Sequence, residues 1–292
     1  MARILFIGIG KMGLPISMNL LRAGHELVVF DKNPAQTALA VGKGAVAATD
    51  LPAEAGAAEF IFTMLPASQH LVDVVMGEAG AARHMAAGRI WVDMSTVSVE
   101  ASRRCNAAID AAGGMFLRAA VNGSTLFAEN AQLTVIASGR RAAYDRALPL
   151  LEKLSQTRFY LGDADQARLM KLAVNLVVHA TIEVFAEAAV LCEKGGIDWN
   201  DAIDVFEGSS IASPQLKFKL PAIRKRDYDA SSYAATIVKD SVMALEAAHE
   251  LGVYAPASAA VLQVYEAGVA RGDGGKDFAA VIRTIEAMSG LG

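Results

Sequence analysis

The sequence predicts a chain of two domains, an α/β domain over residues 1–163 and an all-α domain over residues 164–292, joined by a long helix. Three observations predict this architecture. Short runs of β-forming residues alternate with helical stretches as far as Leu161, which is typical of a parallel sheet covered by helices. From Gly162 to Gly196 a single helical stretch ends at a double glycine. Only helical patterns follow it.

The first predicted strand, Arg3 to Ile7, is a short apolar run that leads directly into a glycine-rich turn. A helix is predicted after the turn, as far as Ala23. The turn has the spacing GxGxxG and consists of Gly8, Ile9, Gly10, Lys11, Met12 and Gly13. Its first glycine permits the tight turn, its second lets the backbone approach a pyrophosphate, and its third lets the helix lie close to the strand. The N-terminus of that helix then attracts the phosphates.

The second predicted strand, Glu26 to Phe30, ends at Asp31. In a Rossmann-type dinucleotide-binding domain, an acidic residue about 20 residues beyond the glycines binds the ribose hydroxyls of NAD. Strand, turn, helix, strand and acid stand here in that order, so we predict such a domain. Because the Asp31 carboxylate would repel a 2′-phosphate, we predict NAD in preference to NADP. We also place the adjacent Lys32 at the cofactor. Its positive charge would attract a 2′-phosphate and so acts against the preference for NAD.

Polar loops follow the next two predicted strands. Glu59 to Leu65 runs into Pro66, and Arg89 to Val92 runs into a segment of four residues that ends at Thr96. Open α/β sheets bind ligands at the carboxyl ends of their strands, so these loops are predicted to line the ligand site. The remaining elements expected in this domain are strands at Met115–Leu117, Leu133–Ala137 and Thr157–Leu161 and helices at Ser98–Ala112 and Ala142–Leu154.

Two polar residues stand out in the long helix. Lys171 and Asn175 are four positions apart, so they project from one face of the helix and can contact the same small molecule. The simpler alternative is a lysine whose stem covers apolar surface while its head stays in water. Between Leu172 and Cys192 the helix is apolar nearly all round, which indicates a packed core helix. Its polar residues are too frequent for a membrane span, so no membrane is expected.

The all-α domain contains four further predicted helices. They are Trp199–Glu207, Tyr233–Leu251, Pro256–Ala270 and Asp277–Met288, the last with Asp277 as its N-cap. Several are apolar on more than one face, so a homodimer or homotetramer is expected. The stretch from Gly208 to Ser232 is less regular, and its basic residues indicate a solvated face. These are Lys217, Lys219, Arg224, Lys225 and Arg226.

Composition excludes several other classes of protein. The chain has 27 basic and 31 acidic residues, a net charge of -4 and no block of like charge, so nucleic acid is not an expected partner. Cys105 and Cys192 lack metal-ligand spacing and are expected to be reduced structural thiols, with no metal site. The N-terminus enters a strand without the features of a signal peptide. A cytoplasmic location is therefore expected.

The chain resembles the β-hydroxyacid dehydrogenases, the family that includes 3-hydroxyisobutyrate dehydrogenase and tartronate semialdehyde reductase. The resemblance covers nearly the whole chain. It implies a nucleotide-binding domain, a long linking helix and a helical domain that dimerises. The residues that carry it are the glycine turn with Pro15 and Asn19, then Met64-Leu65-Pro66, Asp93-Met94-Ser95-Thr96, Lys171 with Asn175, and Lys239-Asp240.

The resemblance also implies a role for each matching residue. Lys171 is expected to donate or accept the proton, Asn175 to position the substrate, and Lys239 to lie near cofactor and substrate. Leu65, Pro66 and Thr96 match positions that contact the cofactor. The segment Asn122, Gly123 and Ser124 matches the loop that grips the acid group of the substrate, and we place Ser95 with it.

Several positions depart from the family pattern. Where the family has D-x-P-V-S-G-G, this chain has Arg118-Ala119-Ala120-Val121-Asn122-Gly123-Ser124, and Phe127 replaces a nearby glycine. Asp165 and Ala167 stand where glycines precede the lysine, and Val174 replaces an asparagine. An asparagine amide reaches further than a serine hydroxyl, which suits a larger or differently shaped anion. Arg118 could clamp a carboxylate, although its place on the strand before the loop favours a surface or structural role.

We therefore expect hydride transfer between NAD(H) and a small, anionic 3-hydroxy acid or its semialdehyde. Lys171 would stabilise the charge that grows on the carbonyl oxygen and supply its proton. An imine reductase shares the architecture but usually has another residue in place of Lys171. A dinucleotide-binding scaffold without turnover would not need the lysine and asparagine. A decarboxylating enzyme of the phosphogluconate type would need a larger helical domain.

Overall fold

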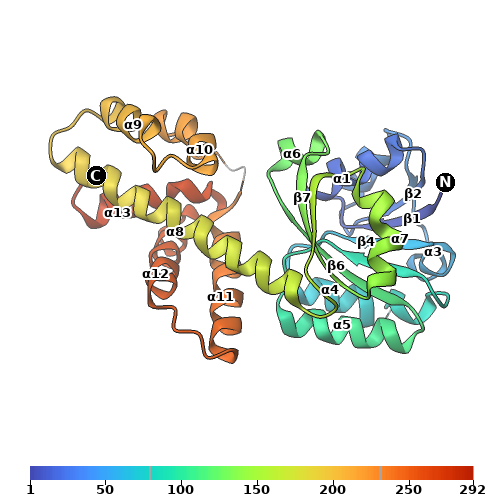
Figure 1. The fold of residues 1–292 in the computed structure, drawn as a ribbon. Coiled ribbons are helices and arrows are strands. Elements are labelled where there is room, and N and C mark those ends of the chain that lie inside the picture. The colour runs from blue at the N-terminus through green and yellow to red at the C-terminus, as the bar shows by residue number, and fades with distance from the viewer. Residues whose placement is uncertain (79, 230–231, 292) are drawn as a thin grey trace. The chain divides into compact units, whose positions relative to one another are not determined.

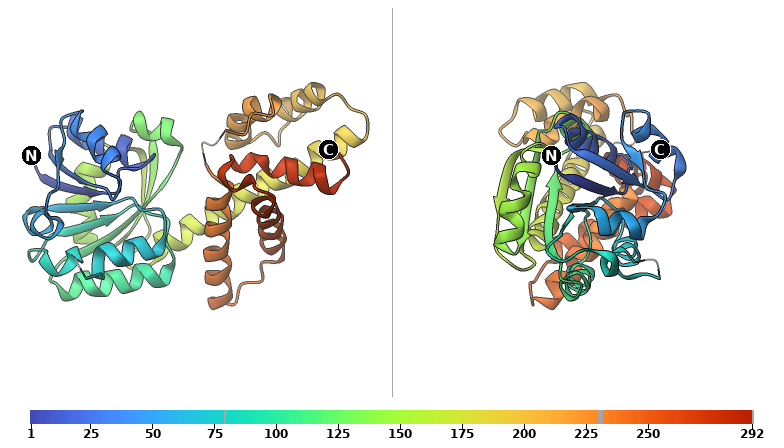
Figure 2. Two further views of the ribbon diagram at one scale, coloured as in Figure 1. Left: turned by 180° about the vertical axis from the view of Figure 1, so that it is seen from behind. Right: turned by 90° about the vertical axis from the view of Figure 1, so that its right-hand side faces the viewer.

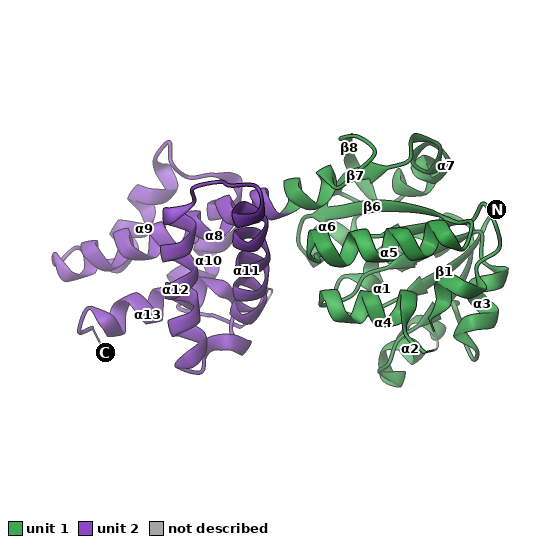
Figure 3. Cartoon of the chain, turned by 90° about the horizontal axis from the view of Figure 1, so that it is seen from below, with its two compact units in different colours: residues 1–171 green, residues 172–292 purple. Residues whose placement is uncertain are grey.

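The computed structural model describes residues 1–78, 80–229 and 232–291, and it divides the chain into two compact units. Unit 1 is Met1–Lys171 and unit 2 is Leu172–Gly292 (Figure 3). The α/β region, the long helix and the all-helical region follow one another as the sequence predicts (Figure 1). The sequence places the division after residue 163. In the structure the first turns of the long helix belong to unit 1.

Within its described residues, unit 1 contains one sheet of eight strands in the order β3-β2-β1-β4-β5-β6-β7-β8. The pairs are parallel except for β6 and β7, which are antiparallel. The first two strands have the predicted bounds. The strands are β1 (Arg3–Ile7), β2 (Glu26–Phe30), β3 (Val46–Ala47), β4 (Phe60–Thr63), β5 (Ile90–Asp93), β6 (Met115–Asn122), β7 (Leu133–Gly139) and β8 (Ser155–Tyr160).

Strand β6 is longer than the sequence predicted. It was expected to end at Leu117, but it continues as far as Asn122 because it pairs with β7 from Leu117 onward. The last pair in this ladder is Asn122 with Thr134. That pairing fixes where the backbone of Asn122 lies. Strand β3 was not predicted, since two residues are too few to show a period.

Helices cover both faces of the sheet (Figure 2). Successive residues of a strand point to opposite faces. Ile4 and Phe6 therefore pack with α1 and α7, whereas Leu5 and Ile7 pack with α4 and α5. The helices of unit 1 are α1 (Gly13–Arg22), α2 (Pro34–Val41), α3 (Leu51–Ala57), α4 (Ser68–Met76), the 3-10 turn η1 (Ala81–His84), α5 (Val99–Ala111), α6 (Thr125–Glu129) and α7 (Arg141–Leu151).

Unit 2 packs its helices around the long helix α8 (Gln166–Lys194), which begins in unit 1. Ile182, Phe185 and Val190 of α8 lie in the core of this unit. Helices α11 and α12 lie side by side (Figure 2). The other elements are α9 (Trp199–Gly208), α10 (Pro214–Arg224), α11 (Ala234–Glu250), α12 (Pro256–Ala270), η2 (Asp273–Gly275), η3 (Phe278–Ala280) and α13 (Val281–Met288).

The basic stretch in unit 2 differs from its prediction. Pro214–Arg224 forms α10, with Ser213 as its N-cap, where the sequence suggested an irregular segment. Lys219 is buried and forms an ion pair of 2.7 Å with Asp277, so it is not part of a solvated face. Asp277 also caps the 3-10 turn η3 by accepting a hydrogen bond from Ala279 N–H at 3.1 Å. The predicted N-cap is therefore present. Asp277 also neutralises the buried Lys219, which only the tertiary structure shows.

By length and composition alone, helix α8 could cross a membrane. However, 44% of its most apolar stretch is buried within the protein. Two of its buried polar residues, Asn175 and His179, have partners inside unit 2. His179 Nδ1 lies 2.9 Å from Ser241 Oγ, and Asn175 donates a hydrogen bond to Asp240. These contacts are what a packed core helix requires, because buried polar groups need hydrogen-bond partners.

Glu183 should make the stability of the helical unit depend on pH. Burial raises the pKa of this carboxyl from 4.5 to about 7, and the neighbouring Glu187 adds to the rise. Between these two values the folded chain therefore keeps a proton that the unfolded chain releases. The contribution of this carboxyl to stability is full below pH 4.5 and is lost as the pH rises through about 7. We expect the Tm of Glu183→Gln to exceed that of the wild type more at the upper end of this window than at the lower end. Parallel Tm curves would contradict this, and Glu246→Gln, at an exposed position, is the control.

Candidate active site

The glycine turn has the shape that a dinucleotide requires. Gly8 has a φ of +94°, and a Cβ there would lie 2.3 Å from Met64 O. A Cβ on Gly13 would lie 1.8 Å from Gly8 O, so the start of α1 can touch the strand only if this residue is glycine. At Gly10, by contrast, an added Cβ would meet no described atom within 4 Å. The open space at Gly10 lies where the pyrophosphate of a dinucleotide would approach the backbone.

The N-terminus of α1 suits an anion. Among the described residues no side chain caps this helix, and its first turn contains no acidic residue. The unsatisfied N–H groups and the helix dipole at such an end attract phosphate. Lys11 is exposed beside it, and Met12 is half-buried.

Asp31 lies at the end of β2, next to the glycine turn. Its Oδ2 accepts a hydrogen bond from Ile9 N–H at 2.7 Å, and its Oδ1 accepts one from Asn33 N–H at 2.8 Å. Each carboxylate oxygen can accept a further bond, so the ribose hydroxyls could still be bound. Lys32 is exposed at the adjacent position. The residues present therefore fit a nicotinamide dinucleotide, on the geometry of the turn and of this carboxylate.

A buried polar network organises the loops after β4 and β5. Asp93, with no exposed surface, accepts hydrogen bonds from Thr63 Oγ1 at 2.7 Å and from Ser95 Oγ at 2.6 Å. Ser95 Oγ in turn accepts the N–H of Leu65 at 2.8 Å. The hydroxyl of Ser95 is thus buried and committed to the two loops. The substrate contact that we predicted for Ser95 stays a prediction, and its side chain shapes the loops that carry Leu65, Pro66 and Thr96.

Arg168, one turn before Lys171 on α8, neutralises Asp93. Its guanidinium is 1% exposed, forms an ion pair with Asp93 and donates to Ser95 O at 2.6 Å. Its Nε donates to Ser102 Oγ at 3.2 Å. Sequence reasoning missed both Arg168 and Asp93 as members of one cluster, because they are 75 positions apart. They attach the start of α8 to the loop after β5.

Arg118 has a structural role. It is 4% exposed, pairs with Asp165 at 2.8 Å and donates to Ser102 Oγ at 3.1 Å. It is therefore held by Asp165 and is not presented as an anion clamp. Both members of this pair, the arginine on β6 and the aspartate before α8, depart from the family pattern. Arg103, which is largely exposed, also pairs with Asp165.

Lys171 and the loop after β6 meet within unit 1. Lys171 Nζ donates to Asn122 Oδ1 at 2.7 Å, and both residues are half-buried. Gly123 has a φ of +132°, and a Cβ there would lie 2.8 Å from Leu133, so the chain turns sharply at this point. Ser124 Oγ is buried and has no hydrogen-bond partner among the described residues. The simpler alternative, a lysine whose head lies in water, does not account for the contact with Asn122.

In unit 2, a buried carboxylate connects two of the predicted residues. Asp240 is 5% exposed; it accepts a hydrogen bond from Asn175 Nδ2 at 2.8 Å and forms an ion pair of 2.8 Å with Lys239. Sequence reasoning noted the Lys239-Asp240 dipeptide but assigned a role only to the lysine. Asn175 follows Lys171 by one turn on α8. Asp240 orients the amide of Asn175 by accepting this hydrogen bond. The sequence did not predict that contact.

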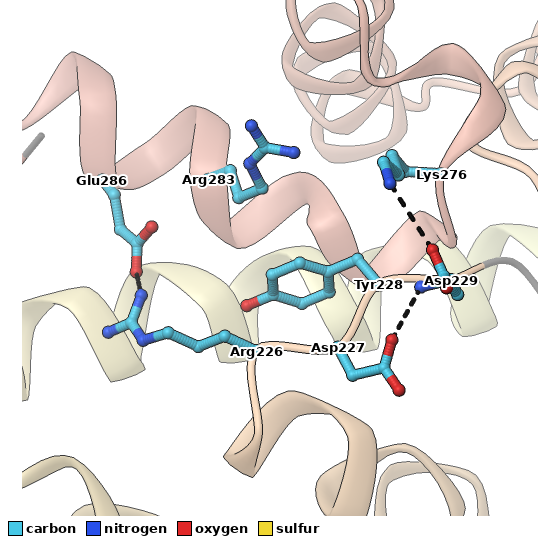
Figure 4. Close-up of a pocket in the computed structure, with 7 residues that line it drawn as sticks. All are labelled: Arg226, Asp227, Tyr228, Asp229, Lys276, Arg283 and Glu286. Carbon is cyan, nitrogen blue, oxygen red and sulfur yellow. Dashed lines mark hydrogen bonds and ion pairs between the residues drawn. The ribbon is translucent and has the colours of Figure 1, made fainter.

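A separate hollow of about 350 Å³ lies on unit 2, and Figure 4 shows its lining. Each of its three cations already has an acidic partner: Arg226 pairs with Glu286, Lys276 with Asp229, and Arg283 with Asp273. Paired charges leave little to attract a ligand, so we assign it no function. The lining residues are Arg226, Asp227, Tyr228, Asp229, Lys276, Arg283 and Glu286.

The doubly covered sheet, the glycine turn and Asp31 define a dinucleotide-binding domain of the Rossmann type. Residues 3–162 match the family model of the NAD-binding domain of 6-phosphogluconate dehydrogenase, and residues 166–285 match the NAD-binding model of NADP-dependent 3-hydroxyisobutyrate dehydrogenase. The chain belongs to the β-hydroxyacid dehydrogenase family.

Relatives and solved structures agree with this assignment. Glyoxylate/succinic semialdehyde reductase 2 of Arabidopsis thaliana is 31% identical over 97% of this chain and 79% of its own length. The 3-sulfolactaldehyde reductase of Escherichia coli is 31% identical over 100% of this chain and 98% of its own. A structure of 3-hydroxyisobutyrate dehydrogenase from Mycobacterium tuberculosis, with L-serine, superposes with a TM-score of 0.88 at 28% identity, covering 98% of this chain and 99% of that one.

Proposed function

We propose that this protein interconverts a small anionic 3-hydroxy acid and its semialdehyde, with NAD(H) as cofactor and Lys171 as the acid and base. The observation that carries this proposal is the contact of Lys171 with Asn122, because it places an ammonium group beside the loop expected to hold the substrate. The names of the relatives support the substrate class, since both describe reductases of small aldehydes.

The bound cofactor would supply or accept the hydride. During reduction, negative charge grows on the carbonyl oxygen of the substrate, and a neighbouring ammonium both stabilises that charge and delivers the proton. Lys171 would have this role. Asn175, oriented by Asp240, would donate a hydrogen bond to the substrate without changing its own charge.

The loop after β6 would bind the acid group of the substrate. Ser124 Oγ is buried without a partner among the described residues, and an unsatisfied buried hydroxyl is costly. An oxygen of a bound carboxylate or sulfonate would satisfy it, together with the amide of Asn122 and the backbone at Gly123. Leu65, Pro66, Thr96 and Lys239 keep their proposed place at the cofactor.

The test of the proposal is a substrate panel, read at the nicotinamide absorbance. It should contain succinic semialdehyde, glyoxylate and 3-sulfolactaldehyde for reduction, and 3-hydroxyisobutyrate, glycerate and serine for oxidation. We expect turnover of at least one anionic aldehyde and, because of Asn122, a preference other than 3-hydroxyisobutyrate. Absence of turnover with every member, in a chain that binds NADH, would favour a scaffold.

Asp31 predicts a preference for NADH over NADPH. Its carboxylate is fixed by Ile9 and Asn33, so it cannot move away from a 2′-phosphate without losing both bonds. We expect kcat/KM to be about tenfold or more higher with NADH, and Asp31→Ser to narrow that ratio by removing the repulsion. Lys32→Ala is the matched control. It removes the positive charge beside Asp31 and should increase the ratio of kcat/KM with NADH to kcat/KM with NADPH. A tenfold preference for NADPH in the wild type would show that Asp31 is wrongly assigned.

We also propose that unit 2 forms a homodimer, or a homotetramer built from it. Helix α8 carries exposed apolar side chains at a spacing of seven: Val177, Val184 and Leu191 are 68%, 58% and 73% exposed. Such a stripe on one helix face marks an interaction surface. We expect an oligomeric mass by light scattering at micromolar concentration and a smaller mass for Leu191→Glu. Leu39→Glu, in unit 1, should leave the mass unchanged, and a monomeric wild type would exclude the proposal.

The cytoplasm remains the proposed location. Burial raises the pKa of the Cys105 thiol to about 12, which makes it an inert structural thiol. Both cysteines are free.

A further inference from the structure

The contact between Asn122 and Lys171 has a feature that the proposed reaction does not by itself require. The lysine is held by a neutral amide carbonyl, where the family pattern has a serine. Asn122 Oδ1 accepts from Lys171 Nζ at 2.7 Å.

The backbone fixes this acceptor. Asn122 ends β6 and pairs with Thr134 of β7, so its Cα belongs to the sheet. The next residue, Gly123, holds a φ of +132°, which few residues other than glycine adopt. A Cβ at Gly123 would also press against Leu133 and Phe127. The asparagine thus extends from a rigid strand end, while Lys171 extends from a helix that Arg168 ties to the same sheet.

The chemistry of the amide matters as much as its place. With Oδ1 turned to the ammonium, the two N–H groups of the amide point elsewhere, so acceptor and donors are separated on one flat group. A carboxylate at this position would favour the charged lysine and hinder proton release, whereas a neutral carbonyl orients the lysine with less effect on its charge. A serine hydroxyl, one bond shorter, would not reach the same point from the same backbone.

We propose that Asn122 is a positioning residue for Lys171, which holds the ammonium for proton transfer through its side-chain carbonyl. This inference rests on the proposed function of Lys171 as the acid and base. Asn122 therefore acts on the rate of the proton step as well as on the recognition of the substrate.

The test measures the titration of Lys171 directly and does not depend on turnover. Trace labelling of the amine with acetic anhydride across a pH series, read by mass spectrometry of the peptide that contains Lys171, gives its titration midpoint. We expect Asn122→Asp to raise the midpoint by about one pH unit or more, because an opposite charge at this distance favours the ammonium. Asn122→Ala should lower it, because a hydrogen bond to the charged form is lost.

Opposite shifts in two variants at one position separate positioning from a general structural defect. Asn130→Asp, at an exposed position beyond α6 in the connection between β6 and β7, makes the same amide-to-carboxylate exchange and should leave the midpoint unchanged. Equal midpoints in the wild type and both Asn122 variants would overturn the inference, even if the substrate panel succeeds. A shift without turnover of any substrate would uphold the contact and contradict the proposed function.

Turnover adds a second readout. Asn122→Ala should reduce kcat by about ten- to a hundredfold, the loss expected of a hydrogen bond to a charged group. Asn122→Asp should move the alkaline limb of the kcat profile for reduction to higher pH, because the lysine keeps its proton longer. A change confined to KM in both variants would reduce Asn122 to a substrate contact and contradict the positioning role.

Discussion

Replacing Lys171 by alanine is expected to abolish turnover while NADH binding survives. General acid and base groups contribute about a hundredfold to ten-thousandfold to rate, and this ammonium would also stabilise the charge on the carbonyl oxygen. The glycine turn and Asp31 belong to other elements and do not depend on its side chain. We therefore expect kcat to fall by at least about a hundredfold with an unchanged Kd for NADH.

The control for this prediction is Lys153→Ala, an exposed lysine of unit 1, which should behave as the wild type. Circular dichroism and thermal unfolding establish that both variants fold. A folded Lys171→Ala protein that binds NADH and keeps more than about a tenth of the kcat would leave the lysine without a catalytic role.

The second large effect is expected at Arg168. Replacement by methionine removes the ion pair with Asp93 and the bonds to Ser95 and Ser102, and it leaves a carboxylate with no exposed surface unpaired. Removing one partner of a buried pair typically costs about 3–5 kcal/mol. We expect a loss of that order in the free energy of unfolding, measured in denaturant, and weaker NADH binding, because the loops after β4 and β5 lose their anchor.

Two comparisons make the Arg168 experiment specific. Arg103→Ala removes an exposed partner of Asp165 and should cost no more than about 1 kcal/mol. The double variant Arg168→Met with Asp93→Asn should recover part of the loss, because the unpaired buried charge is gone. If Arg168→Met is as stable as Arg103→Ala, the network does not hold these loops.

The elements that local rules determine could be predicted from the sequence. The bounds of β1 and β2, the glycine turn and the place of Asp31 all depend on residues within one βαβ unit, and the structure has them as predicted. The long helix followed in the same way from its apolar pattern and its terminal glycines. The short helix α10 was missed, because Pro221 lies inside it and interrupts the helical pattern of the sequence.

The parts that were not predicted depend on pairs far apart in the chain. Lys219 was taken for a solvated residue because its partner, Asp277, lies 58 positions away. Arg168 and Asp93 carry no local sign of their pairing, and the sequence likewise does not show that the Ser95 hydroxyl is buried against Asp93. The carboxylate of Asp240 could have been suspected from its place beside Lys239, but its bond to Asn175 depends on the packing of α11 against α8.

The most direct test of the proposed chemistry is the transfer of deuterium to the best aldehyde of the panel. The donor is NADH in which both hydrogens at C4 of the nicotinamide are replaced by deuterium. We expect one deuterium on the carbinol carbon of the product for the wild type and none above background for Lys171→Ala under the same conditions, as measured by mass spectrometry. A product without deuterium, or equal labelling by both proteins at equal rates, would contradict the claim that this chain transfers a hydride with Lys171 as its proton donor.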